Sequence, residues 1–151
     1  MKNTKPKIFD MLNDLIDIND KTKIGYETAA QNVLDLNIRD FFLHISFERE
    51  DYSRELWHLL KNLDNELIDS LSYSICPQYS WGNFINSPLY QNLQPLLYSC
   101  AMEDNIAINL YTKTLSEDFL NKNIRSVISS QLNGIYNCLK FLFNPANFHL
   151  A

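Results

Sequence analysis

Glycine is scarce in this chain, which has only Gly25, Gly82 and Gly134 among 151 residues. Soluble proteins average about 7% glycine. Sandwiches, barrels and propellers use glycine at their hairpins and bulges, and phosphate-binding loops need motifs such as GxGxxG or GxxxxGK[ST], neither of which occurs here. The scarcity therefore argues against all-β folds and nucleotide-loop α/β folds, and it favours long helices with few joints.

The chain also has fewer basic than acidic residues and lacks long apolar runs. Thirteen lysines and arginines face eighteen acidic residues, so the net charge is −5, and the basic stripe typical of a nucleic-acid binder is missing. No apolar run approaches the roughly 20 residues of a membrane span. The N-terminal lysines are not followed by the apolar stretch of a secretory signal. We therefore expect neither nucleic acid nor a membrane as a partner.

The three cysteines, Cys76, Cys100 and Cys138, are an odd number without CxxC spacing. This pattern argues against a disulfide framework or a zinc site, and it is typical of a protein of the reducing cytoplasm. We therefore expect a cytoplasmic protein with free thiols.

Apolar residues at spacings of three and four predict four long helices. Their expected ranges are 6–33, 38–63, 95–117 and 123–143. The segment 64–94 is broken by Pro77, Gly82 and Pro88, and we expect it to be a long crossover that contains one short helix. Two short loops and one long crossover indicate an all-α, one-crossover four-helix bundle that forms a single domain over 1–151.

The two predicted hairpins share a weak internal repeat. Tyr26 precedes Asn37-Ile38-Arg39 by eleven residues, and Tyr111 precedes Asn123-Ile124-Arg125 by twelve. Duplication of a helical hairpin would explain the repeat. Chance would explain it as well, because a tyrosine and a tripeptide carry little information.

Acidic side chains lie on or beside the apolar stripes of these helices. The carboxylates that we expect to face the interior, and therefore the candidate metal ligands, are Glu27, Glu48, Asp51 and Asp104. The expected inward-facing neighbours of that cluster are Tyr26, Tyr111 and Gln131. Buried carboxylates need a cation, a proton or dense hydrogen bonding, and clusters on facing helices hold di-iron or di-manganese centres. Iron or another divalent metal is the cofactor that such a cluster would bind.

A second interpretation needs no metal. Glu27 and Glu48 lie near the stripe edges, where they can pair at the surface with Lys23, Arg49 or Arg54 in exposed ion pairs of little energetic value. The tyrosines are then core aromatics whose hydroxyls bind a neighbouring carboxylate. No nucleophile motif such as GxSxG occurs, so the sequence offers no catalytic residues.

Several segments together resemble a known family. These are LNDLID at 12–17, GYETAA at 25–30, FER at 47–49 and REL at 54–56. They resemble an uncharacterised bacterial family of ferritin-like four-helix-bundle proteins, a domain of unknown function. Trp81, Cys100, Asp104, Tyr111 and Gln131 fit the positions of that family in the crossover and in the third and fourth helices. The resemblance covers nearly the whole chain and is strongest over the first two helices.

The resemblance implies a ferritin-like bundle in up-down-down-up order with a relict or modified metal site. Glu27 and Glu48 match carboxylates of the first two helices, Asp51 stands where ferritin-like proteins have a histidine, and Asp104 would serve from the third helix. The fourth helix departs from the pattern because it offers Gln131 in place of a carboxylate or histidine.

Three functions follow from the sequence as expectations. The first is a non-catalytic structural, stress-associated or interaction protein with a degenerate carboxylate site. The second is a metal-binding protein or a di-iron-type oxidoreductase that uses the core carboxylates. The third is a module whose aromatic crossover around Trp81 binds a partner or a second copy, which would make a homodimer.

Overall fold

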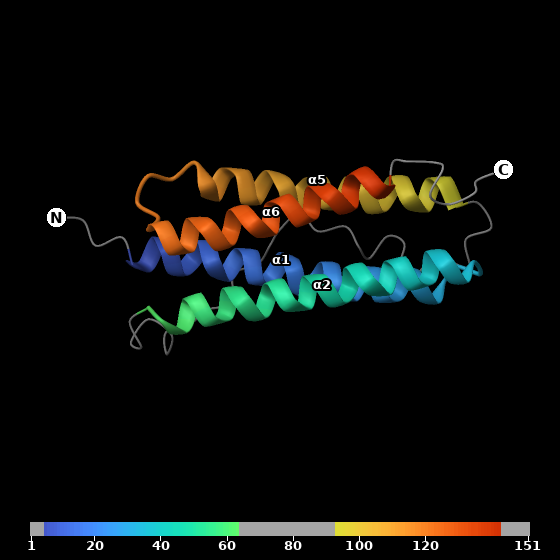
Figure 1. Ribbon diagram of the computed structural model, residues 1–151, viewed down its shortest axis with the longest axis horizontal. Coiled ribbons are helices and arrows are strands. Elements are labelled where there is room, and N and C mark those ends of the chain that lie inside the picture. Colours follow the sequence, from blue (N-terminus) through green and yellow to red (C-terminus); the bar gives the residue numbers. More distant parts are fainter. Residues whose placement is uncertain (1–4, 64–92, 143–151) are drawn as a thin grey trace.

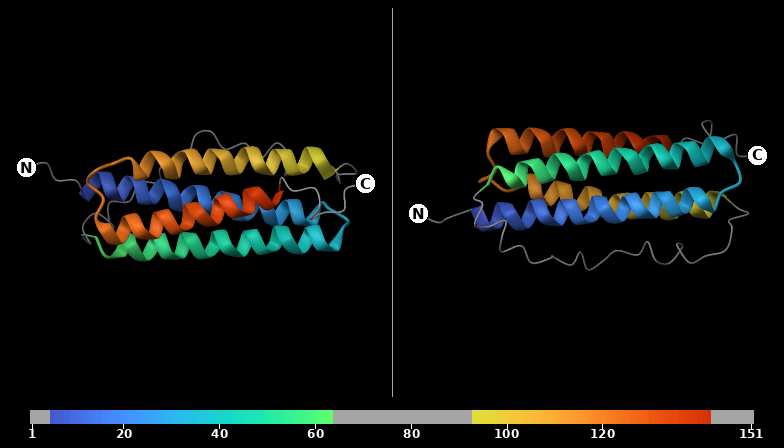
Figure 2. Two further views of the ribbon diagram at one scale, coloured as in Figure 1. Left: turned by 45° about the horizontal axis from the view of Figure 1, so that its top comes forward. Right: turned by 90° about the horizontal axis from the view of Figure 1, so that it is seen from below.

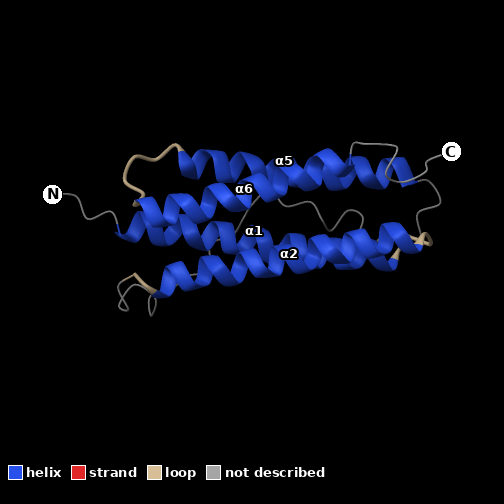
Figure 3. Ribbon diagram, viewed as in Figure 1, coloured by secondary structure: helices blue, strands red, loops and turns tan. Residues whose placement is uncertain are grey.

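The computed structural model describes residues 5–63 and 93–142. These residues form four helices and no strand (Figures 1 and 3): α1 (Lys5–Gln31), α2 (Leu36–Lys61), α5 (Leu93–Leu115) and α6 (Lys122–Leu142). The all-α prediction is confirmed for these residues, and the helix ends fall within two residues of the predicted ends. The predicted crossover, with its short helix and Trp81, lies outside the described residues, apart from the two positions that open α5.

Each helix packs mainly against two others. α1 contacts α2 and α5, and α6 contacts α2 and α5, so that α1 lies diagonally across from α6 and α2 from α5 (Figure 2). α1 and α2 form one antiparallel hairpin, and α5 and α6 form the second (Figure 1). No helix in the two described stretches combines the length and apolar character needed to cross a membrane.

Side-chain caps start the second helix of each hairpin. Asp35 Oδ1 accepts hydrogen bonds from the main-chain N–H groups of Asn37 (2.9 Å) and Ile38 (3.2 Å) at the start of α2. Asn121 Oδ1 accepts one from the N–H of Ile124 (2.8 Å) at the start of α6. The first N–H groups of a helix have no partner inside the helix, so such caps fix where it begins. Asn121 is therefore the N-terminal cap of α6.

One arginine closes each hairpin in the same way. Arg39 of the first NIR repeat and Arg125 of the second both donate to two main-chain carbonyls near the C-terminus of the preceding helix. The acceptors are the oxygens of Ala30 (3.2 Å) and Val33 (2.8 Å) for Arg39, and those of Leu115 (2.6 Å) and Glu117 (2.6 Å) for Arg125. The shared arrangement supports duplication as the origin of the repeat.

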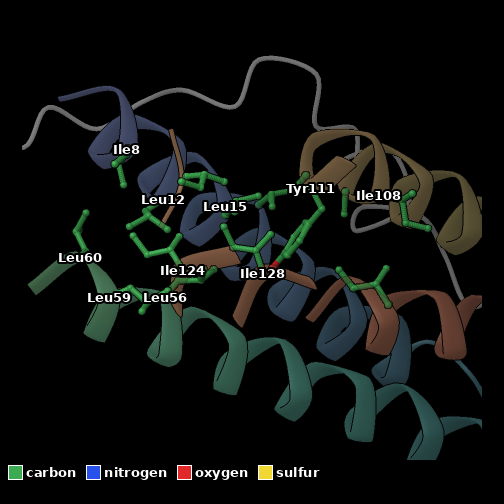
Figure 4. Close-up of a cluster of buried hydrophobic side chains, with 14 of the residues drawn as sticks. Ile8, Leu12, Leu15, Leu56, Leu59, Leu60, Ile108, Tyr111, Ile124 and Ile128 are labelled. Atoms are coloured by element: carbon green, nitrogen blue, oxygen red, sulfur yellow. The ribbon is translucent and has the colours of Figure 1, made fainter. Parts of the chain in front are cut away.

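The core has two apolar clusters. One is built from residues such as Leu12, Leu56 and Ile128 (Figure 4), and the other surrounds Tyr26 and Phe42. Burying a leucine or isoleucine completely stabilises the fold by roughly 1.5–3 kcal/mol. Along α1 and α2, the buried polar residues fall between the two clusters in sequence. The bundle therefore has a polar layer enclosed by apolar packing on both sides.

Candidate functional site: a buried polar layer

An ion pair lies in the middle of the bundle. Arg49 Nη2 lies 2.9 Å from Asp104 Oδ1, and neither side chain is exposed to solvent. The second carboxylate oxygen, Asp104 Oδ2, accepts a hydrogen bond of 2.6 Å from the Tyr26 hydroxyl. We call Tyr26, Arg49 and Asp104 the charged rung, because they link α1, α2 and α5 across the core.

A second set of hydrogen bonds, the neutral rung, consists of Asn19, Tyr111 and Gln131. The Tyr111 hydroxyl accepts from Asn19 Nδ2 (2.7 Å) and donates to Gln131 Oε1 (2.7 Å). Gln131 Nε2 in turn donates to the main-chain oxygen of Tyr52 and to Glu55 Oε1, both at 3.2 Å. The neutral rung thus joins α1, α5, α6 and α2.

The two rungs are related by a constant sequence offset. Tyr26 and Tyr111 are 85 positions apart, and so are Asn19 and Asp104. In each rung a tyrosine of one hairpin bonds to a polar side chain of the other, so the partners are exchanged between the hairpins. The rungs are seven residues apart on both α1 and α5, which is about 10 Å along a helix. This reciprocity also supports duplication of a hairpin.

A third polar group lies at the contact of α2 with α6. Glu48 Oε1 accepts hydrogen bonds from the Tyr52 hydroxyl (2.8 Å) and from Cys138 Sγ (3.6 Å). A Cβ atom added at Gly134 would overlap the Tyr52 hydroxyl and would lie 3.3 Å from Glu48 Oε1. Glycine is needed at this position because the tyrosine ring of α2 lies directly against the backbone of α6.

Burial shifts the proton equilibria of this layer. It raises the pKa of Cys138 to about 12, and the nearby Glu48 carboxylate adds to the rise. It also raises the pKa values of the Tyr26 and Tyr111 hydroxyls. Burial raises the pKa of Asp104 as well, and the Arg49 guanidinium opposes that rise. The thiol and the phenols therefore stay protonated at neutral pH and serve as hydrogen-bond donors rather than as nucleophiles.

Four of the residues predicted to face inward are in the interior. Tyr26, Asp104, Tyr111 and Gln131 are all buried. Their positions followed from the apolar stripes, which place every third or fourth residue on one side of a helix.

The other three predicted ligands lie closer to the surface. Glu48 is half-buried. Glu27 forms an ion pair with Lys23 (2.7 Å) at the α1–α2 surface, as the metal-free interpretation expected. The prediction that Asp51 faces inward is wrong, because its side chain is 67% exposed and pairs with Arg54 at 3.1 Å.

Arg49 is a second residue whose position differs from the sequence interpretation. Its charge suggested a surface position beside the stripe, whereas it is completely buried. The available signal was its spacing: Arg49 lies four residues after Ile45 and seven before Leu56, both of which are fully buried. Asp51 is two residues further along, which turns it about 160° away from Arg49 at 100° per residue.

The placement of the carboxylates bears on the metal hypothesis. Glu27, Asp51 and Asp104 each have a lysine or arginine as partner. Within residues 5–63 and 93–142, no group of three or more His, Cys, Asp or Glu side chains is arranged to hold a metal ion. A di-iron or di-manganese centre needs such a group, so the residues described do not fit one.

A scan against known protein families finds no match, and a search of the curated proteins finds no similar sequence.

Proposed function

We propose that this chain is a ferritin-like bundle. Its interior holds an ion pair where ferritin-like proteins hold a metal centre. It then acts as a non-catalytic structural, stress-associated or interaction protein with a degenerate carboxylate site. The observation that carries the proposal is the complete burial of Arg49 against Asp104. A guanidinium supplies the positive charge that a buried carboxylate needs, and a metal ion bound to Asp104 would be repelled by it.

The directions of the helices support the ferritin-like order. Hydrogen bonds from Asn19 to Tyr111 and from Tyr26 to Asp104 show that residue numbers rise along α1 as they fall along α5. Because α1 is also antiparallel to α2, the helices α2 and α5 run in the same direction (Figure 1). These directions support our proposal of an up-down-down-up order with one long crossover.

The metal content of the purified protein tests the proposal. We expect material from cells grown with ample iron, manganese and zinc to hold less than about a tenth of an equivalent of any of them, and Glu48→Ala to change nothing. A stoichiometric metal that is lost in Glu48→Ala would overturn the proposal. That result would favour the alternative function, a metal-binding protein or a di-iron-type oxidoreductase that uses the core carboxylates.

Exposed apolar side chains support a role in interaction. Ile24, Leu34, Leu36 and Phe47 are 53%, 74%, 66% and 61% exposed, all on the α1–α2 hairpin. Phe47 also lines an open groove of about 460 Å³ between these helices, together with Ala30 and Leu43. Exposed apolar side chains beside a groove often mark a contact surface, and we propose that a second copy of the chain binds at the groove lined by Phe47.

Light scattering tests the homodimer. We expect the mass of a dimer for the unaltered chain and of a monomer for Phe47→Glu, whereas Tyr136→Glu, at an exposed position on α6, should leave the dimer intact. A monomer at every concentration of the unaltered chain would contradict this part of the proposal.

We also propose a cytoplasmic location. Cys100 and Cys138 are free and buried, which suits a reducing compartment.

A further inference from the structure

Both rungs contain buried polar atoms without a hydrogen-bond partner among the described residues. Arg49 Nε and Nη1, together with Asn19 Oδ1, have no hydrogen-bond partner among the described residues and no contact with solvent. Buried polar atoms are almost always bonded, to protein or to ordered water, and an unsatisfied one costs about 1–3 kcal/mol. The unsatisfied groups of the two rungs are complementary, since Arg49 contributes donors and Asn19 an acceptor.

These groups lie at neighbouring levels of the α1–α2 interface. Ser53 Oγ donates to the main-chain oxygen of Ile16, and Ser46 Oγ donates to Glu27 Oε1, both at 3.3 Å. On α2, Arg49 comes four residues before the first of these serines and three residues after the second. Because the helices are antiparallel, Arg49 lies at a level between these two contacts. The interval of α1 between them, 16–27, contains the α1 members of both rungs.

The charges around Arg49 decide what can bind there. An anion would accept from the guanidinium, but it could not donate to Asn19 Oδ1, and the carboxylates of Asp104 and Glu48 would repel it. A metal cation would be repelled by Arg49. A neutral molecule that both donates and accepts meets every requirement, and water is the one small enough for a closely packed helical core.

We propose that an ordered internal water molecule binds between the charged and neutral rungs. It accepts a hydrogen bond from Arg49 and donates one to Asn19 Oδ1. A buried water typically makes about three hydrogen bonds to protein groups, and the second free nitrogen of Arg49 is available for a further bond. The water joins the two rungs into one network that links all four helices.

High-resolution crystallography and NMR of the unaltered protein test this inference. We expect an ordered water within hydrogen-bond distance of both an Arg49 nitrogen and Asn19 Oδ1, and magnetisation transfer from water to the Arg49 Nε–H. The inference is overturned if both free nitrogens of Arg49 bind protein atoms only. It is equally overturned if crystals grown in bromide show an anomalous peak beside Arg49, because the ligand would then be an anion.

A pair of variants separates a bridging water from one held by Arg49 alone. Asn19→Leu removes the acceptor, and we expect the magnetisation transfer to Arg49 Nε–H to be lost. Asn105→Leu, at an exposed position on α5, should leave the transfer unchanged. Transfer that persists at full strength in folded Asn19→Leu would overturn the bridge. If Asn19→Leu does not fold, the measurements on the unaltered protein decide the question. The outcome does not depend on metal content, so it is distinguishable from the test of the proposed function.

Discussion

Arg49 and Asp104 connect the two diagonally opposed helices α2 and α5 through an ion pair of 2.9 Å, and neither side chain is exposed. The pair joins one hairpin to the other across the core. Removing either partner alone should lower the stability of the fold, because it leaves a buried charge without compensation.

Asp104→Asn should therefore be strongly destabilising. We expect the free energy of unfolding to fall by about 3–5 kcal/mol, the range for breaking a buried ion pair from one side, as measured by urea denaturation. Asp51→Asn is the matched control, since it removes one partner of an exposed pair and should change the stability by less than about 1 kcal/mol. Similar losses in the two variants would contradict the burial of the pair. Replacing both partners, as Arg49→Met with Asp104→Leu, should recover most of the loss.

Gly134→Ala should destabilise the protein although alanine is the better helix former. Alanine gains about 1 kcal/mol in helix propensity, but its Cβ would overlap the Tyr52 hydroxyl. Overpacking of this kind typically costs about 1–3 kcal/mol, so we expect a net loss of stability in urea denaturation. Tyr52→Phe in the Gly134→Ala background should recover part of it, and Asn133→Ala, at an exposed position on the same helix, should not destabilise. A net gain in Gly134→Ala would refute the close contact.

Arg39→Ala and Arg125→Ala should have similar effects, because each arginine donates to two carbonyls at the end of the preceding helix. Hydrogen bonds from a charged group contribute about 1.5–3 kcal/mol, so we expect each variant to lower the free energy of unfolding by about that amount. Lysine should restore little, because its ammonium is a point charge and not a planar fork. Arg54→Ala, on an exposed arginine, is the control. If Arg54→Ala destabilised the protein as much as Arg39→Ala and Arg125→Ala, the hydrogen bonds to the preceding helix would not be the cause of the loss.

Stability should fall at alkaline pH. Burial raises the pKa of Cys138 to about 12 from its ordinary value of 9.0. The folded state therefore holds this proton more tightly, and the resulting stabilisation is fully present below about pH 9 and is lost as the pH rises through about 12. The raised pKa values of Tyr26 and Tyr111 act in the same sense. We expect the urea midpoint to be lower at about pH 10.5 than at about pH 8, with a smaller drop in Cys138→Ala. A midpoint that rises over this interval would contradict the burial of these groups.

The periodicity of the apolar residues is enough to predict all four helices. The start of α2 also has a local cause, because the Asp35 carboxylate accepts from the first free N–H groups of the helix. The same spacing located the interior tyrosines. These features depend on residues within a few turns of one another, so a local pattern contains them.

The burial of Arg49 could not be predicted in that way. Whether a charge is buried depends on its partner, and Asp104 lies 55 positions further along the chain on a helix of the other hairpin. The error for Asp51 has a different origin. Asp51 lies three residues after Glu48, which is at the edge of the buried face, and one further turn of the helix places Asp51 on the solvent side.

The exchange of partners between the rungs has a consequence for the hairpins as separate pieces. Tyr26 of the first hairpin relies on Asp104 of the second, and Tyr111 of the second relies on Asn19 of the first. A hairpin alone would contain only some of the hydrogen-bonding side chains of each rung. Those side chains would be exposed to water or buried without their partners. We therefore expect neither hairpin to adopt a defined structure without the other.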